Sequence, residues 1–217
     1  FVAALTEAGF LSVLIPEEYD GSGLGLEAAC AVLEEIHRSG SNGGACHAQM
    51  YTMGTLLKHG SEEQKRHYLP KIASGELRLQ AFGVTEPGAG TDTTRISTFA
   101  RRDGDDYVVN GQKIWTTMAH DATHIFMLVR TDPDTPRKQQ GISFVLAPMD
   151  QPGVEVRTIT TLSGETEFCE VFFDNARTPR ENLVGELNKG WSMAKALLSF
   201  ERIFIGAPSL AQNALGQ

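Results

Sequence analysis

The spacing of apolar positions changes twice along the chain. Up to about residue 76, apolar residues recur every three or four positions, which is the period of amphipathic helices. Ser61 and Gln64 match a capping box at a helix start, and Gly9, Gly60 and Gly75 follow helical runs as end signals. The pattern predicts helices over residues 1–9, 26–38, 45–59 and 61–75.

From residue 77 the apolar positions alternate in short segments broken by Gly, Pro and Asp, which is typical of strands. Asn110-Gly111 lies between two such segments and predicts a hairpin with a type I′ turn. No helical segment separates the strands, so we expect an antiparallel sandwich or barrel. The predicted strands are residues 78–84, 95–101, 106–110, 112–117, 123–129, 141–147, 154–159 and 167–173.

The helical period returns in the last thirty or so residues. The sequence therefore predicts an α+β chain with three parts. These are an N-terminal helical domain at 1–76, a middle antiparallel β domain at 77–187, and the first helix of a C-terminal helical bundle at 188–217. Both ends fall inside helical patterns, so we expect the complete protein to be longer.

Composition and charge exclude several classes of protein. The formal net charge of −8 argues against nucleic acid, which needs clustered Lys and Arg. Cys30, Cys46 and Cys169 are far apart, odd in number and without C-x-x-C spacing, so we expect reduced thiols. We expect no metal site, because no H-x-x-x-H pair occurs. The longest apolar runs, such as Ile125–Val129, are too short to span a membrane.

Two segments are candidates for chemistry. In Phe82–Asp92 a predicted strand runs into a loop of small and hydroxyl residues, which lets backbone N–H groups approach a phosphate or a heteroaromatic ring. The loop lacks the Walker A and G-x-G-x-x-G patterns. In Lys113–Thr117, Trp115 offers a flat wall to a planar ligand, and its neighbouring threonines can bind ring heteroatoms. Taken singly, an ordinary turn and a core tryptophan are the simpler interpretations.

The two segments together resemble the middle domain of acyl-CoA dehydrogenases. The likeness continues through Gly104–Tyr107 and Asn110–Lys113 in the same predicted domain. Further segments resemble the family's helical domain and the end of its β domain, and they are Leu14–Tyr19, Gly60–Lys65, Glu167–Asp174 and Glu181–Gly185. An ordered set of this extent favours the functional interpretation of both segments.

The resemblance implies a non-covalently bound FAD. It implies that Phe82, Val84 and Thr85 line the flavin ring. It also implies that Gly90 and Thr91 lie by the pyrophosphate, with Thr91 contacting the acyl-CoA substrate as well. The family commonly has serine at Thr91, and threonine keeps the hydroxyl.

The second segment is implied to form the other part of the flavin site. By resemblance, Trp115 packs against the isoalloxazine, Thr116 lies beside it, and Thr117 hydrogen-bonds the N5 edge. The implied reaction is α,β-dehydrogenation of an acyl-CoA thioester. A base removes the α-proton and the β-hydride passes to flavin N5.

Glu201 is the candidate for the base. It falls on a helical stripe with Trp191, Ala194, Leu198 and Ile205. A carboxylate in apolar surroundings has its pKa raised toward a useful value. In the family some members carry the base at this position and others much further on, beyond Gln217; we favour Glu201. The alternative is a structural ion pair of Glu201 with Arg202 or with a residue outside this sequence. By resemblance, Arg202 lies near the substrate.

The resemblance also implies partners and a compartment. We expect a homotetramer or dimer, an electron-transfer flavoprotein as electron acceptor, and the bacterial cytoplasm or the mitochondrial matrix. An acyl-CoA oxidase or flavin monooxygenase on the same scaffold is an alternative, which rapid reoxidation by O₂ would reveal. A DNA-associated flavoprotein would need a basic surface, and a non-catalytic partner in a hetero-oligomer would lack the base.

Overall fold

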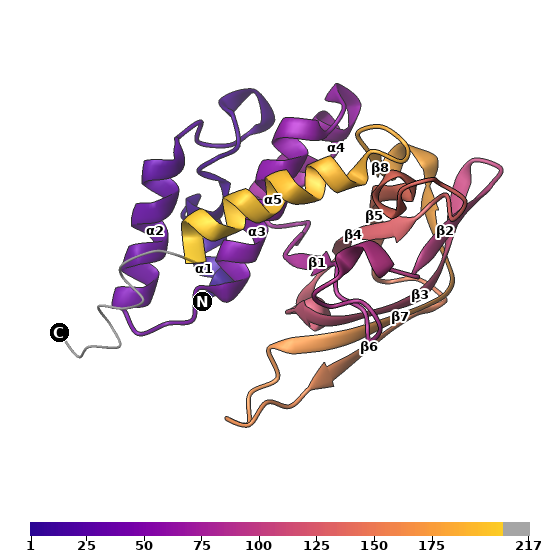
Figure 1. The fold of residues 1–217 in the computed structure, drawn as a ribbon. Coiled ribbons are helices and arrows are strands. Elements are labelled where there is room, and N and C mark those ends of the chain that lie inside the picture. The colour runs from indigo at the N-terminus through magenta and orange to yellow at the C-terminus, as the bar shows by residue number, and fades with distance from the viewer. Residues whose placement is uncertain (206–217) are drawn as a thin grey trace. The chain divides into compact units, whose positions relative to one another are not determined.

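A computed structural model describes residues 1–205, except for the side chains of residues 45, 200 and 203–205. It divides into two compact units: residues 1–78 with 196–217, and residues 79–195. Helices form the first unit and strands the second (Figure 1). This order of helices, strands and a further helix confirms the predicted fold class. None of the helices in the described part of the chain is both long enough and apolar enough to cross a membrane.

The first unit has the helices that the apolar period predicts. They are α1 (Val2–Glu7), α2 (Leu26–Arg38), α3 (Gly44–His59), α4 (Glu62–Ser74) and the second half of α5 (Gly190–Ile205). Helix α2 buries Ala29, Leu33 and Ile36, which are spaced at three and four residues along one face. These side chains pack with Leu11, Val13, Cys46 and Met50 into one core cluster.

The second unit is an eight-stranded sheet with the order β6-β7-β3-β2-β4-β5-β8, and β1 pairs with β4. Most pairs are antiparallel, but β4 runs parallel to both β1 and β2. Strands β6 and β7 form a long ribbon (Figure 1). The strands are β1 (Ala81–Gly83), β2 (Phe99–Asp103), β3 (Asp106–Thr117), β4 (His124–Arg130), β5 (Ile142–Pro148), β6 (Val154–Ile159), β7 (Phe168–Pro179) and β8 (Leu183–Val184).

The predicted hairpin turn at Asn110-Gly111 is wrong. Strand β3 continues through these residues, and the turn lies at Gly104-Asp105, between β2 and β3. At Gly111 the pairing with β7 shifts register, as in a β-bulge. The glycine is needed because its φ is +142° and a Cβ would lie 2.6 Å from the Thr98 backbone. The Asn110-Gly111 sequence does allow an unusual backbone conformation, but in the folded protein that conformation occurs within β3, where the pairing with β7 shifts register.

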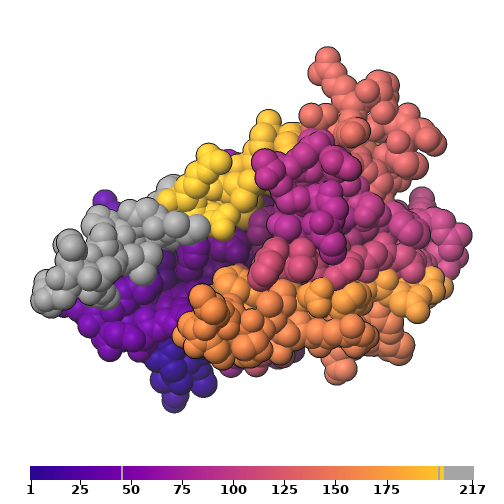
Figure 2. All heavy atoms as spheres, turned by 60° about the horizontal axis from the view of Figure 1, so that its bottom comes forward, coloured from indigo at the N-terminus to yellow at the C-terminus, as the bar shows by residue number. Residues whose placement is uncertain are grey.

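The loop between β4 and β5 projects from the second unit. Figure 2 shows it as a salmon-coloured prominence on the surface of this unit. Its basic residues, Arg137 and Lys138, are exposed. The strands that the loop joins, β4 and β5, bury nearly every residue along their length, so both of their faces are covered.

The capping box at the start of α4 supplies the first test. Ser61 Oγ accepts from the Gln64 N–H at 3.1 Å, and Gln64 Oε1 accepts from the Ser61 N–H at 2.9 Å. Ser61→Ala removes one acceptor and should lower the free energy of unfolding by about 1 kcal/mol in urea denaturation. Ser163→Ala, in an exposed loop, is the control and should change it by less than about 0.5 kcal/mol. Equal effects would show that the box adds no stability.

Candidate active site

The loop after β1 presents its main chain openly. Glu86 and Ala89 close a tight turn through two backbone hydrogen bonds of 3.2 and 3.0 Å. Gly88 and Gly90 do not have positive φ, and a Cβ built on either meets no atom within 4 Å. Neither conformation nor packing within the described chain therefore requires glycine at these positions. Their small size keeps the backbone amides open to close approach by a ligand.

Trp115 is held in a strained and exposed position. Its φ is +61°, a left-handed conformation that is costly for a residue with a bulky side chain. The register of β3 against β7 shifts between Lys113 and Thr116, so Trp115 lies in a bulge. Its side chain remains 54% exposed and meets the Phe168 ring edge-on at 6.2 Å. The bulge therefore turns a large aromatic surface outward.

Thr116 is unfavourable for the opposite reason to Trp115, because it is a polar residue that is buried. The residue is fully buried, and its hydroxyl has no hydrogen-bond partner in the described chain. A buried polar group without a partner is unfavourable unless a ligand or water satisfies it. Next to it, Thr117 is half-buried at the end of β3.

The loop and the bulge lie side by side. The Ile114 N–H donates to the Thr85 carbonyl at 2.9 Å, and Lys113 Nζ donates to the Val84 carbonyl at 3.3 Å. Lys113 Nζ also forms a 2.7 Å ion pair with Glu86, and both side chains are buried. The two candidate segments of the sequence thus form one structural site.

The residues predicted to bind FAD all belong to the second unit. Phe82 lies on β1, half-buried, and stacks on Phe144 with ring centroids 5.8 Å apart. Val84 and Thr85 are also half-buried. The predicted residues furthest along the loop, Gly90 and Thr91, are exposed. An open glycine loop, a flat exposed ring and an unsatisfied buried hydroxyl fit a large planar ligand with a phosphate tail.

Glu201 and Arg202 belong to the first unit, on α5. Glu201 is half-buried, and burial raises its pKa above the ordinary value although the charge of Arg202 opposes the shift. No ion pair within 4.0 Å joins it to Arg202, which is exposed; both residues lie within the described part of the chain. The structure therefore does not support the alternative that Glu201 serves as the partner of Arg202.

Helix α3 packs near Glu201. The Glu201 main chain hydrogen-bonds His47, and the charge of Glu201 raises the pKa of the buried Tyr51, whose burial is the larger cause. The His47 and Tyr51 rings meet edge-on at 5.0 Å. Glu201 therefore lies near His47 and Tyr51 on α3, and its burial disfavours the charged carboxylate.

The predicted stripe on α5 is only partly right. Ala194 is buried and Trp191 half-buried, but Leu198 is 36% exposed and Leu197 is fully buried instead. The side chain of Ile205 lies outside the described residues. The buried face of α5 is therefore rotated by about one residue from the predicted one. The helix is so apolar that two neighbouring sets of positions, each spaced by three and four residues, both look like a buried face in the sequence.

Comparisons with known proteins identify the family. Residues 1–76 match the model "Acyl-CoA dehydrogenase, N-terminal domain", and residues 81–176 match "Acyl-CoA dehydrogenase, middle domain". The acyl-CoA dehydrogenase IpdE1 of Mycobacterium tuberculosis is 41% identical over 210 residues, covering 96% of this chain and 53% of the relative. The chain belongs to the acyl-CoA dehydrogenase family.

Two solved structures of the family have closely similar folds. One is described as "Tcur3481-Tcur3483 steroid ACAD", with a TM-score of 0.89, 36% identity, and coverage of 98% of this chain and 55% of that one. The other is the ChsE4-ChsE5 complex of Mycobacterium tuberculosis, with a TM-score of 0.82, 34% identity, and coverage of 96% and 53%. The chain spans about half the length of the relatives that it matches.

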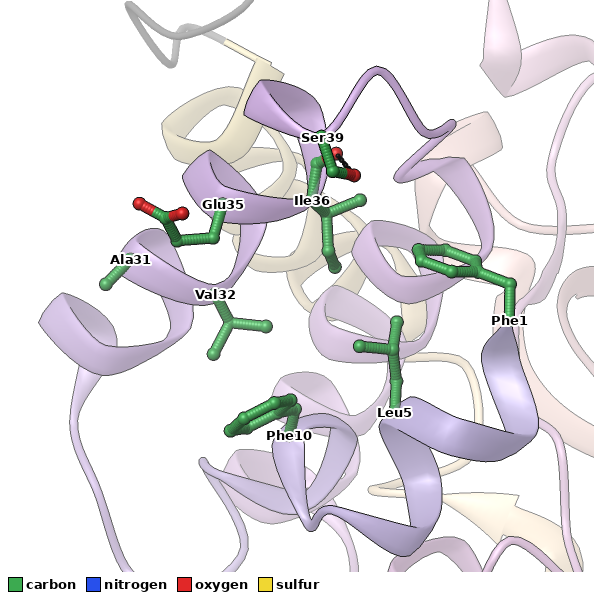
Figure 3. Close-up of a pocket in the computed structure, with 8 residues that line it drawn as sticks. All are labelled: Phe1, Leu5, Phe10, Ala31, Val32, Glu35, Ile36 and Ser39. Atoms are coloured by element: carbon green, nitrogen blue, oxygen red, sulfur yellow. Dashed lines mark hydrogen bonds between the residues drawn. The ribbon is translucent and has the colours of Figure 1, made fainter.

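An apolar hollow in the first unit is separate from all these residues. Its volume is about 360 Å³, and Figure 3 shows the side chains of Leu5, Val32 and Ile36 directed toward it. Its two polar lining residues are engaged elsewhere: Glu35 pairs with Arg38, and Ser39 donates to the Ile36 carbonyl. None of the predicted site residues lines it.

Sequence reasoning assigned no role to Lys113 or Glu86. Both occur in segments that resemble the acyl-CoA dehydrogenase family, yet a lysine on a strand is normally taken to be solvated. The available signal was weak: Lys113 precedes the apolar residues Ile114 and Trp115, and the adjoining loop carries two carboxylates, Glu86 and Asp92. The structure shows that these two charges are buried together.

The Thr116 hydroxyl can be tested without flavin. Thr116→Val removes a buried group that lacks a partner, so flavin-free protein should keep its free energy of unfolding or gain up to about 1 kcal/mol. Thr178→Val is the matched control, because its equally buried hydroxyl donates to the Leu146 carbonyl at 2.5 Å and accepts from Asn182 at 3.0 Å. That variant should lose about 1–3 kcal/mol. A similar loss at Thr116 would mean that its hydroxyl is satisfied within the protein.

Proposed function

We propose that the complete protein catalyses FAD-dependent α,β-dehydrogenation of an acyl-CoA thioester. The observation that carries the proposal is the joined site in the second unit. There the open Gly88–Gly90 loop is hydrogen-bonded beside an exposed, strained Trp115 and an unsatisfied Thr116 hydroxyl. Family membership supports the same reaction class.

The residues of this site suit the parts of FAD. The loop amides near Gly90 and the Thr91 hydroxyl would hold the pyrophosphate, and Thr91 would also contact the acyl-CoA. Phe82, Val84 and Thr85 would line the flavin ring. Bound FAD would supply the oxidation itself, by taking up the β-hydride.

The β3 bulge would form the other wall of the flavin site. The exposed face of Trp115 would cover the isoalloxazine and exclude water. The buried Thr116 hydroxyl, beside it, would gain the partner that the protein does not provide. Thr117 would hydrogen-bond the N5 edge. These contacts orient the ring rather than perform the chemistry.

Glu201 would act as the base that removes the α-proton. Its half-buried position raises its pKa, so the carboxylate can accept a proton from a weakly acidic carbon more readily than an exposed one. Arg202 would lie at the substrate end of the pocket. A carboxylate beyond Gln217 is the alternative base, as in other members of the family.

The relatives suggest substrates and partners to test. One similar structure is described as a steroid ACAD, and another is a complex of two differently named chains. We therefore propose an acyl-CoA with a bulky, steroid-derived acyl group as one member of the substrate panel. A homo-oligomer and a pairing with a second related chain are both candidate assemblies. An electron-transfer flavoprotein would be the electron acceptor, and the bacterial cytoplasm the compartment.

Flavin binding is the first test of this function. The purified complete protein should carry FAD, or bind it when added, and show a flavin absorption spectrum. Trp115→Ala removes the covering ring and should weaken FAD binding by about 0.5–1.5 kcal/mol or more in fluorescence titration. Phe99→Ala, on β2, is the control with a similarly exposed ring, at 45%, and should leave affinity unchanged. If neither the protein nor its complex with a related chain binds flavin, the proposal is wrong.

The role of Glu201 requires a kinetic test. Glu201→Gln keeps the size of the side chain but removes the proton acceptor, so flavin reduction by a good acyl-CoA should slow by about 10²–10⁴-fold in stopped-flow measurements. FAD content and substrate affinity should change little. Glu34→Gln, an exposed carboxylate on α2, is the control.

The pH dependence gives the same test a second readout. Because the pKa of Glu201 is raised, the rate should fall as pH decreases through a pKa above the ordinary glutamate value, where the base becomes protonated. Glu201→Gln should lose this step. Near-normal flavin reduction in the variant would assign the base to a residue beyond Gln217.

A further inference from the structure

Lys113 is among the largest fully buried side chains of the described residues, and it is charged. Its Nζ donates to Glu86 Oε1 at 2.7 Å and to the Val84 carbonyl at 3.3 Å. Glu86 is also buried, with 4% of its surface exposed. Burying two opposite charges in a protein core is costly, and a pair of this kind is only weak evidence for stability. The pair therefore calls for another explanation.

The Glu86 carboxylate is saturated with donors. Its Oε1 accepts from the Thr98 N–H at 3.0 Å as well as from Lys113. Its Oε2 accepts from the Ser97 N–H at 2.6 Å and from the Ser97 hydroxyl at 2.9 Å. One carboxylate thus joins the glycine loop, the segment that leads into β2, and β3.

The network lies directly behind the proposed flavin site. Lys113 is the last residue of β3 before the bulge that contains Trp115, and its Nζ holds the carbonyl of Val84 in the loop. The next residue repeats the link, since the Ile114 N–H donates to the Thr85 carbonyl at 2.9 Å. Two consecutive residues of β3, Lys113 and Ile114, therefore hydrogen-bond to two consecutive residues of the loop, Val84 and Thr85.

The packing around the lysine stem leaves little freedom. A Cβ built on Gly83 would lie 3.1 Å from Lys113 Cγ, so the glycine on β1 makes room for the aliphatic part of Lys113. Burial lowers the pKa of Lys113 to about 8, against the effect of Glu86. Burial would raise the pKa of Glu86, but the charge of Lys113 and the hydrogen bonds bring it below the ordinary value. Both groups are therefore charged at neutral pH.

We propose that the buried Lys113–Glu86 pair is a positioning device that sets the spacing between the glycine loop and the Trp115 bulge. Lys113 and Glu86 would touch neither flavin nor substrate, and they act through Val84, Thr85 and Trp115. The inference rests on the proposed function, because the spacing that the Lys113–Glu86 pair fixes would be the width of the flavin site. A charged pair suits this task because its hydrogen bonds are directional, whereas apolar side chains of similar volume permit sliding.

The main test measures flavin affinity and stability separately. Lys113→Met keeps the stem and removes the charge, and Glu86→Gln keeps the shape and removes the charge. In the folded holoprotein each should raise the FAD dissociation constant by about tenfold or more. The double variant should raise the FAD dissociation constant by less than the product of the two single-variant factors, because the interaction between Lys113 and Glu86 can be lost only once. The control is Arg177→Met, which breaks exposed ion pairs with Asp103 and Asp106 in the same unit. It should change the FAD dissociation constant by less than about twofold.

A readout without flavin separates this proposal from the function on which it rests. In a variant of the protein in which every other tryptophan, Trp191 included, is replaced by phenylalanine, the fluorescence of Trp115 and its quenching by acrylamide report the bulge directly. Lys113→Met should shift both in flavin-free protein, and Lys113→Arg should restore part of the difference. If Lys113→Met does not fold, Ser97→Ala removes one donor to Glu86 and should give a smaller change in the same direction.

The outcomes are distinct. Unchanged Trp115 fluorescence, together with wild-type FAD affinity in the folded variants, would overturn the positioning role and leave the proposed function intact. A lower melting temperature with unchanged affinity would likewise overturn it, because the pair would then be merely structural. A wild-type protein that binds no FAD would overturn the function itself. The expected changes in both readouts would support the proposal.

Discussion

Strand β3 is the element on which the second unit depends. It pairs with β2 along its first half and with β7 along nearly its whole length. Two register shifts, after Val109 and after Lys113, interrupt the pairing with β7. At the first shift the extra residue belongs to β7, whereas at the second it belongs to β3 and changes the direction of the β3 side chains that follow. The strand can therefore bury both Lys113 and Thr116 while it exposes Trp115, which regular alternation would not allow.

The unfavourable features of the unit gather at the second bulge. A tryptophan with left-handed backbone, an exposed aromatic ring and a buried hydroxyl without a partner occur within two residues. Each is costly by itself, and folded proteins retain such features mainly where function requires them. A planar ligand against the ring and the hydroxyl would offset two of the three costs. The buried charges behind the bulge, by contrast, are fully hydrogen-bonded within the protein.

The helices were predictable because their signals are local. The apolar period gave α2 with its observed bounds, and the Ser61 capping box gave the start of α4. The sheet was harder, since its pairing depends on residues far apart in the chain. The Asn110-Gly111 signal would fit a turn equally well, and only the approach of Thr98 decides that Gly111 lies in a bulge.

The candidate site was predictable only in part, and for a similar reason. The resemblance to the family pointed to the residues from Phe82 to Thr91 and to the Trp115 segment, which the structure joins through backbone hydrogen bonds. It gave no reason to single out Glu86 and Lys113, since neither burial nor pairing can be seen in a sequence. The burial of Leu197 in place of Leu198 on α5 depends equally on packing against other elements.

Two glutamates show how surroundings shift the pKa of one chemical group in opposite directions. Both are withdrawn from solvent, and burial alone would raise the pKa of each. At Glu86, the Lys113 ammonium and the donors from Ser97 and Thr98 reverse the shift, so this carboxylate stays ionised and serves as a fixed anchor. At Glu201 only the exposed Arg202 opposes burial, and the pKa remains raised. A base must be able to accept a proton and release it again, which a saturated carboxylate cannot readily do. Of these two groups, Glu201 is better suited to the proposed role of base, because its raised pKa lets it take up a proton more readily.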